Sequence, residues 1–201
     1  MNNLVEIAET FIGANEEVKK GLFEYYNNHC FDLVKPERRY RIQPDDDWCA
    51  MFVSVVAHLA GYSKHIFPYE VSVREQVRIS ELRAMYFEGG LNASQNDLVI
   101  YDWLGNGTFD HVGIVVEVGN RYLTVIEGNK GDTVDYRTIR LNSKAVRGFI
   151  KLTPTNPLPE NERLQTIAKD VLKGRYGNGN ERRVKLGKDY QAVQKIVNEL
   201  L

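Results

Sequence analysis

The sequence has few cysteines, no long apolar run and no excess of charge of one sign. Its 201 residues include two cysteines, Cys30 and Cys49, which are too few for a disulfide framework, and we expect both to be free thiols. No apolar stretch approaches the roughly 20 residues of a membrane-spanning helix. The formal net charge of −1 argues against a general nucleic-acid-binding protein, which normally has a strongly basic face.

Other common signals are missing as well. The first 21 residues contain four glutamates and lack the basic start and apolar core of a secretory signal, so we expect a protein made without an export signal. The hydrolase motifs GxSxG and HExxH do not occur. With 43% hydrophobic residues, the chain has enough apolar side chains for one packed domain and a small second unit.

The first part of the chain has the hydrophobic spacing of helices. Three segments show it: residues 2–30, which fit two short helices, residues 48–59 and residues 70–87. The middle helix is predicted to begin at Cys49, with Asp46 or Asp47 as its cap, and to stop at Gly61.

After Gly89 and Gly90 the hydrophobic period changes to two, which is typical of strands. Five segments show this alternation: DLVIYDW, HVGIVVEV, YLTVIEG, TVDYRTIRL and VRGFIKL. They predict an antiparallel meander of about five strands that follows the helices. Helices followed by such a sheet indicate an α+β fold.

A proline-rich stretch, residues 153–159, is predicted to be an extended linker between domains at 1–152 and 160–201. The tail has nine basic and six acidic residues and reads as a small helical bundle, with helices in residues 160–174 and 190–200 around a loop at 175–182. The apolar residues expected to point inward in the first tail helix are Leu164, Ile167, Ala168, Val171 and Leu172.

Cys49 occupies the position where a nucleophile is expected. At the start of a helix, unpaired N–H groups and the helix dipole favour a thiolate. A nucleophilic thiol needs a base, and His111 is the best placed of the four histidines because it opens a strand after a loop. Cys30 has no such partners, and we interpret it as structural.

Glu127 is the candidate that orients His111. If the loop between their strands has three residues, Val118 to Asn120, positions whose numbers sum to 238 pair and His111 faces Glu127. A two-residue loop would place the two on opposite faces, so catalysis requires the three-residue loop or a bulge. Asn129, on the same face as Glu127, could orient the histidine instead.

Five segments, WCAMFVSVVAHLAG, NDLVIYDW, DHVGIVVEV, VIEGN and VRGFIKL, together resemble the CHAP domain, the cysteine, histidine-dependent amidohydrolase/peptidase with a papain-like fold. The resemblance covers roughly residues 3–152. It implies hydrolysis of a peptidoglycan amide bond by an amidase or an endopeptidase. It implies Cys49 as nucleophile, His111 as base and Glu127 as orienting residue, with Asn129 as a further polar member.

The tail resembles the three-helix cell-wall-binding repeats at the end of a pneumococcal phage lysozyme and of many phage lysins. This resemblance implies peptidoglycan as the partner, through a single repeat. It also implies a phage or prophage endolysin, made in the host cytoplasm and released through a holin-type pore. We expect a monomer.

Further contacts to the substrate and the wall are expected from a few aromatic and basic side chains. Those expected are Trp48, Tyr101 and Trp103 in the groove, and Arg175 and Arg182 in the tail. Some CHAP enzymes bind calcium through acids before the nucleophile, which invites a site at Asp45, Asp46 and Asp47. These adjacent acids lack the spaced pattern of such sites, so we expect no metal and no cofactor.

Two other functions are consistent with parts of the sequence. A lysin that has lost catalysis would bind the wall without cutting it, although the intact set of Cys49, His111 and Glu127 argues against this. The tail has a net charge of +3 over 42 residues, which barely supports nucleic-acid binding. We expect no nucleic-acid partner and no membrane association.

Overall fold

The computed structural model describes residues 3–89, 93–152, 160–172, 174, 176–186 and 189–200. Contacts divide the chain into two compact units, the first made of most of residues 3–152 and the second containing the described residues after 159. The predicted linker at residues 153–159 lies outside the described residues. The domain boundaries therefore stay a prediction.

The first unit begins with helices, as the hydrophobic spacing predicts. Its helical segments are α1 (Leu4–Glu9), α2 (Glu16–Tyr25), the π-helical η1 (Tyr26–Cys30), the short 3-10 turns η2 (Phe31–Leu33) and η3 (Pro36–Arg38), α3 (Cys49–Leu59) and α4 (Val73–Leu82). Asn3 and Asn15 cap α1 and α2 with their side chains. Gly61, with φ +82°, follows the end of α3 in the left-handed conformation that glycine favours.

A six-stranded antiparallel sheet follows, so the α+β class is confirmed. Its strands are β1 (Tyr86–Glu88), β2 (Leu98–Tyr101), β3 (His111–Val118), β4 (Tyr122–Lys130), β5 (Thr133–Arg140) and β6 (Val146–Ile150). Their order is β1-β6-β2-β3-β4-β5. The simple meander is therefore wrong at its end, because β6 returns to pair with the free edge of β2 instead of β5. The sixth strand, β1, precedes Gly89.

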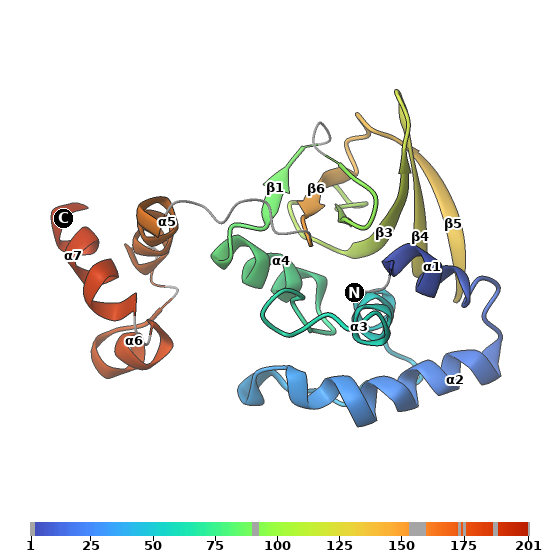
Figure 1. Cartoon of the computed structure of the whole chain (residues 1–201), viewed down its shortest axis with the longest axis horizontal. Helices are drawn as coiled ribbons and strands as arrows, with labels where there is room; N and C mark the ends of the chain where they lie inside the picture. Colours follow the sequence, from blue (N-terminus) through green and yellow to red (C-terminus); the bar gives the residue numbers. More distant parts are fainter. Residues whose placement is uncertain are drawn as a thin grey trace. The chain divides into compact units, whose positions relative to one another are not determined.

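The helix α3 packs against β3 and β4 (Figure 1). The two faces of the sheet contribute to two apolar clusters, with Leu98 and Ile100 in one and Val99 and Tyr101 in the other. Gly128 permits the close approach of β4 to α3, because a Cβ there would lie 2.4 Å from the Cβ of Phe52. This approach brings the end of β4 to the start of α3.

The second unit contains three helices: α5 (Glu160–Leu172), α6 (Gly179–Leu186) and α7 (Tyr190–Leu200). Two expectations are wrong here. Leu172 is 42% exposed instead of inward, whereas the other four predicted apolar residues of α5 are buried. The loop expected at 175–182 already contains the first turns of α6. Gly179 and the asparagines around it favoured a loop, but the packing of α6 against α7 overrides that local preference.

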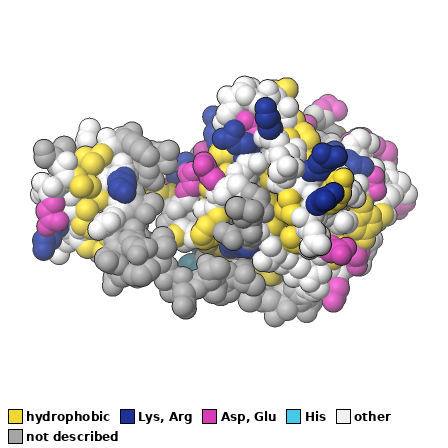
Figure 2. All heavy atoms as spheres, turned by 90° about the horizontal axis from the view of Figure 1, so that it is seen from above, with side chains coloured by type: hydrophobic (Ala, Val, Ile, Leu, Met, Phe, Trp, Pro, Cys, Tyr) yellow, Lys and Arg dark blue, Asp and Glu magenta, His cyan; other side chains and the backbone are white. Residues whose placement is uncertain are grey.

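The visible surface carries mixed charge. On the face seen in Figure 2, basic and acidic side chains are interspersed among apolar and neutral ones, without a broad patch of one sign. Among the described helices, none has both the length and the apolar character needed to span a bilayer.

Candidate active site

Cys49 is the first residue of α3 and is 4% exposed. The N-cap residue, Trp48, makes no side-chain capping hydrogen bond, and the first turn contains no acid. The N–H groups of this turn are therefore free of a competing side-chain cap, and together with the helix dipole they favour negative charge at the sulfur. Both cysteines are free thiols, as expected.

The acids before Cys49 do not cap α3, contrary to the sequence-based expectation. Asp46 accepts hydrogen bonds from the backbone N–H of Gln43 at 2.7 Å and from the hydroxyl of Tyr40 at 3.3 Å. Asp47 accepts one from the amide of Asn129 at 3.0 Å. Both carboxylates therefore bond to groups other than the N–H groups in the first turn of α3.

These acids also do not form a cation site in the structure. The described residues contain no group of three or more His, Cys, Asp or Glu side chains arranged to hold a metal ion. The spread of Asp46 and Asp47 to separate partners, instead of towards one point, accounts for this. The absence of a metal at Asp45 to Asp47 stays a prediction.

His111 and Glu127 come together through a bulge and not through the expected register. Next to the β3–β4 turn, Val118 pairs with Leu123, but beyond a bulge between Val115 and Glu117 the pairing shifts so that Ile114 faces Ile126. The expected pairing of numbers that sum to 238 is wrong. The bulge nevertheless returns His111 and Glu127 to the same face as diagonal neighbours.

The His111 ring is hydrogen-bonded on one side to a carboxylate. Its Nε2 lies 3.1 Å from Oε2 of Glu127, which leaves Nδ1 for the thiol. Burial lowers the pKa of His111, but hydrogen bonds to Cys49 and Glu127 and the charges of both groups outweigh it and raise the pKa to about 9. The site therefore favours an imidazolium between a thiol and a carboxylate.

Glu127 is fully buried, with 0% of its side chain exposed. Burial would raise the pKa of this carboxyl, but its contacts with His111 and Arg137 hold the pKa below its ordinary value. A Cβ at Gly113 would lie 2.8 Å from Cγ of Glu127, so a glycine opposite the glutamate leaves room for its side chain.

Arg137, which the sequence did not single out, holds the other side of Glu127. Its Nε lies 2.8 Å from each carboxylate oxygen. Its guanidinium carbon lies 4.7 Å from the ring centroid of Trp103. Because β5 pairs with β4 so that Val125 faces Arg137, the arginine is a diagonal neighbour of Glu127. Arg137 could be identified only from the pairing of β5 with β4.

Asn129 does not contact His111 through any hydrogen bond of the structure. It adopts φ +59° near the end of β4 and donates to Asp47. In this geometry Glu127 is hydrogen-bonded to His111, and Asn129 ties the end of β4 to the segment that precedes Cys49.

Two of the three aromatic residues expected to line the groove are buried. Trp48 is 1% exposed, packs beside Phe23 and Phe52, and donates its indole N–H to Asp132 at 3.2 Å. Tyr101 is 0% exposed. Both rings lie in the core, and their expected contact with substrate stays a prediction.

Tyr101 packs between two other rings of the site. Its ring stacks on His111, with centroids 5.7 Å apart, and on Trp103, with centroids 4.7 Å apart. Burial and then the charge of Glu127 raise the pKa of Tyr101 well above its ordinary value. Trp103 is 43% exposed and remains available to a ligand.

Of the two tail arginines, the structure describes Arg182. Arg182 bonds within its own unit, to the carbonyl of Gly177 at 3.1 Å, to Gln194 at 3.0 Å and to Asn178 at 3.1 Å. These contacts brace the turn before α6, so its expected contact with the wall is not supported. Arg175 lies outside the described residues.

A thiol at a helix start beside a histidine–carboxylate pair, in an α+β fold, is an arrangement that can perform nucleophilic hydrolysis. Comparison with family models then identifies the parts of the chain: residues 38–129 match the CHAP domain, and residues 165–201 match the CW_7 repeat. No relative among curated proteins matches. The chain carries a CHAP domain and a C-terminal CW_7 cell-wall-binding repeat.

This combination supports a peptidoglycan hydrolase of the amidase or endopeptidase class, which acts at the cell wall. Peptidoglycan is the partner that both parts indicate.

Proposed function

We propose that this protein is a phage or prophage endolysin that hydrolyses a peptidoglycan amide bond with Cys49 as nucleophile and His111 as base and acid. Glu127 keeps the His111 ring oriented and stabilises its charged form. The observation that carries the proposal is the placement of His111 between the thiol of Cys49 and the buried carboxylate of Glu127.

The chemical steps use only groups of this site. His111 takes the proton of the Cys49 thiol as Sγ attacks the carbonyl carbon, and the backbone N–H of Cys49 is a donor to the resulting oxyanion. His111 gives its proton to the leaving amine, so that the C–N bond breaks and a thioester remains. Water then attacks the thioester while His111 accepts its proton. His111 returns this proton to Sγ as the C–S bond breaks, which releases the carboxylic acid and restores the thiol.

The single CW_7 repeat supports the delivery part of the proposal, because it tethers the enzyme to its polymeric substrate and raises the local concentration there. We propose that the protein is made in the host cytoplasm and reaches the wall through a holin-type pore. Lysis of an expressing host only when a pore-forming protein is co-expressed would support this route, and lysis without one would contradict it.

The proposal is tested by mass spectrometry of soluble fragments released from purified Gram-positive peptidoglycan. Three proteins are compared: the unmodified chain, Cys49→Ala, and Cys30→Ala as the matched loss of a buried thiol. We expect fragments from the first and third only. New termini at the lactyl group and L-alanine would identify an amidase, and termini within the stem or cross-bridge would identify an endopeptidase.

Two results would contradict the proposal. Fragment release by folded Cys49→Ala at the unmodified rate would exclude the thiol mechanism. Absence of fragments from the unmodified protein on walls of several types, with binding retained, would favour a wall-binding protein without catalysis.

A further inference from the structure

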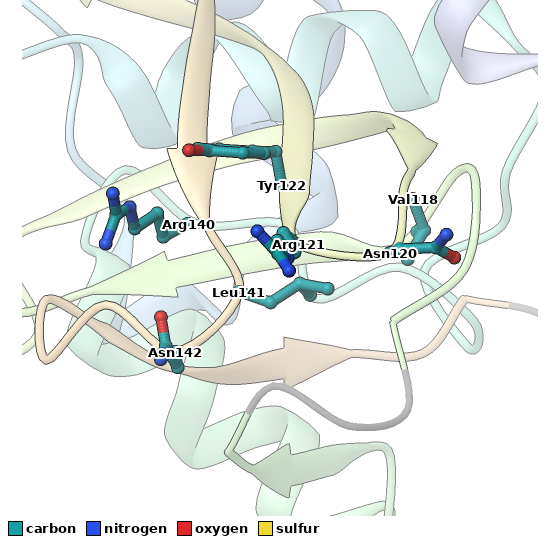
Figure 3. A pocket seen from close by; sticks show the side chains of 7 residues that line it. All are labelled: Val118, Asn120, Arg121, Tyr122, Arg140, Leu141 and Asn142. Carbon is teal, nitrogen blue, oxygen red and sulfur yellow. The ribbon is translucent and has the colours of Figure 1, made fainter.

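A pocket of about 610 Å³ lies at the opposite end of the β3–β4 hairpin from His111. We call it the hairpin pocket. Its lining residues come from the β3–β4 turn and from the end of β5: Val118, Asn120, Arg121, Tyr122, Arg140, Leu141 and Asn142. In Figure 3, Tyr122 and Arg140 extend from neighbouring strands on one side of Arg121, and Val118 and Asn120 lie on its other side.

The pocket contains two arginines and no acid among its lining residues. Elsewhere in this unit Arg38, Arg78 and Arg137 each pair with a glutamate. Within the part of the chain that the structure describes, neither Arg121 nor Arg140 takes part in an ion pair. Two guanidinium groups in one pocket therefore keep their donors available for an oxyanion, which a guanidinium fork can bind through two parallel hydrogen bonds.

The other lining groups suit a sugar chain. Tyr122 is 45% exposed, and Arg140 lies over its ring with 5.9 Å between the guanidinium carbon and the centroid. An exposed aromatic ring offers an apolar face to the C–H groups of a sugar, and the amides of Asn120 and Asn142 can bond to hydroxyls. Aromatic, amide and guanidinium groups thus line one hollow.

Backbone bonds hold these residues in place. Tyr122 and Arg140 are paired across β4 and β5, and the N–H of Leu141 donates to the carbonyl of Arg121 at 3.0 Å. The N–H of Gly119 donates to the carbonyl of Tyr122 at 2.8 Å. The pocket is therefore built on a bonded hairpin, which keeps its donors pre-arranged for a ligand.

The hairpin pocket lies far from His111. β3 runs from His111 to Val118, and at about 3.3 Å per residue the two ends of this strand are roughly 23 Å apart. A small substrate cannot touch both places, but a polymer with repeating units can.

We propose that the hairpin pocket binds an oxyanion, phosphate or carboxylate, carried by a glycan chain of the cell wall. This inference rests on the proposed function, because it makes the pocket a second point of attachment for the same polymer. Binding there holds the wall against the first unit independently of the cysteine site.

The test measures sedimentation of the full-length protein with insoluble Gram-positive walls, in the Cys49→Ala background so that the walls stay intact. Arg121→Gln/Arg140→Gln is compared with Arg74→Gln/Lys35→Gln, which removes two positive charges from exposed positions elsewhere in the unit. We expect about tenfold weaker binding for the pocket variant, in line with the loss of charge-assisted hydrogen bonds, and no change for the control.

Three preparations of wall distinguish the source of the anion: untreated walls, walls freed of phosphate polymers by acid, and walls whose carboxyl groups are amidated. If the difference disappears on walls freed of phosphate polymers by acid, the ligand is a phosphate. If it persists there and disappears after the carboxyl groups are amidated, the ligand is a carboxylate. Equal binding of both variants to all three preparations overturns the proposal.

Folding and the proposed function are checked separately. Each variant is measured by thermal unfolding, and Arg121→Gln alone serves if the double variant does not fold. Binding is measured without catalysis. If the pocket proposal is wrong, the pocket variant and the control variant bind the walls equally. Failure of the proposed function shows instead as absent fragment release by the unmodified chain.

Discussion

The first unit contains two neighbourhoods with a buried cysteine and a histidine, and their histidines have different hydrogen-bond partners. Near Cys49, Nε2 of His111 is hydrogen-bonded to Oε2 of Glu127 at 3.1 Å. Near Cys30, the hydroxyl of Tyr25 lies 2.9 Å from Nδ1 of His58. The two neighbourhoods therefore differ in the partner of the histidine, which is a carboxylate beside Cys49 and a hydroxyl beside Cys30.

The pKa values of these groups show what that difference does. The pKa of His111 is raised to about 9, whereas burial and then the neighbouring His29 lower the pKa of His58. Burial alone raises the pKa of Cys30 to about 12, so this thiol stays protonated. Its Sγ lies 3.9 Å from the carbonyl oxygen of Ser54 and behaves as a small core residue. Burial alone makes such groups inert, and a buried counter-charge makes them reactive.

The largest effect is expected when each of the two cysteines is replaced by alanine in a separate variant. Cys49→Ala should reduce fragment release from peptidoglycan by at least about 10³-fold, since the nucleophile is lost. Cys30→Ala should keep the rate and lower the free energy of unfolding by about 1 kcal/mol, because a small cavity replaces the sulfur. Rates of fragment release and urea unfolding measure both. Equal loss of activity in the two variants would remove the distinction between the neighbourhoods.

The next effect is expected from Glu127→Gln, which turns the His111 neighbourhood into one without a carboxylate. The variant should lower kcat by about 10²-fold, because the imidazolium loses its partner. The alkaline limb of the pH–rate profile, expected near pH 9 in the unmodified protein, should move to lower pH. Glu117→Gln, an exposed change on the neighbouring strand β3, is the control and should leave the limb in place.

The same variant also changes how stability depends on pH. Because the folded pKa of His111 is raised above its ordinary value of 6.5, this group adds stability that is fully present below pH 6.5 and is lost as pH rises through about 9. Glu127→Gln should reduce that contribution. Urea unfolding at pH 6 and pH 9.5 measures the difference, and an unchanged dependence would contradict the charge pairing of His111.

Arg137 sharpens the comparison because it acts on the carboxylate instead of the histidine. Arg137→Gln should lower kcat by about tenfold, since Glu127 loses one of its two anchors. The alkaline limb should move to higher pH, opposite to the shift in Glu127→Gln, because the charge of Glu127 is no longer shared with Arg137 and acts on His111 alone. Arg137→Lys should restore part of kcat. A limb displaced in the same direction in both variants would show that Arg137 only supports the fold.

The smallest effect is expected at His58. Since its folded pKa is lowered, the unfolded chain binds the proton more readily, and stability falls as pH drops below about 6.5. His58→Gln should flatten this part of the dependence, measured by urea unfolding at pH 5.5 and 7.5. His65→Gln, at an exposed loop position, should follow the unmodified protein. An unchanged slope in His58→Gln would mean that the titrating group lies elsewhere.

The strands were predictable from sequence because alternation of apolar residues is a local property. The segment HVGIVVEV matches β3 over its full length, and His111 opens it as expected. The pairing of β6 with β2 was not predictable, since it depends on contacts between residues far apart in the chain.

The site was predictable in part for the same reason. Cys49, His111 and Glu127 could be selected by type and by position at the ends of elements, but the bulge that aligns the last two depends on strand pairing. Arg137 became visible only through the register of β5. The burial of Trp48 was missed because an aromatic residue beside a nucleophile can face either the core or the groove.

The most direct test is the titration of the His111 imidazole by NMR in the unmodified protein. The account predicts a pKa near 9 for this ring, with a lower value in Glu127→Gln. A pKa at or below 6.5 in the unmodified protein would contradict the claim that a buried thiol and carboxylate hold an imidazolium between them.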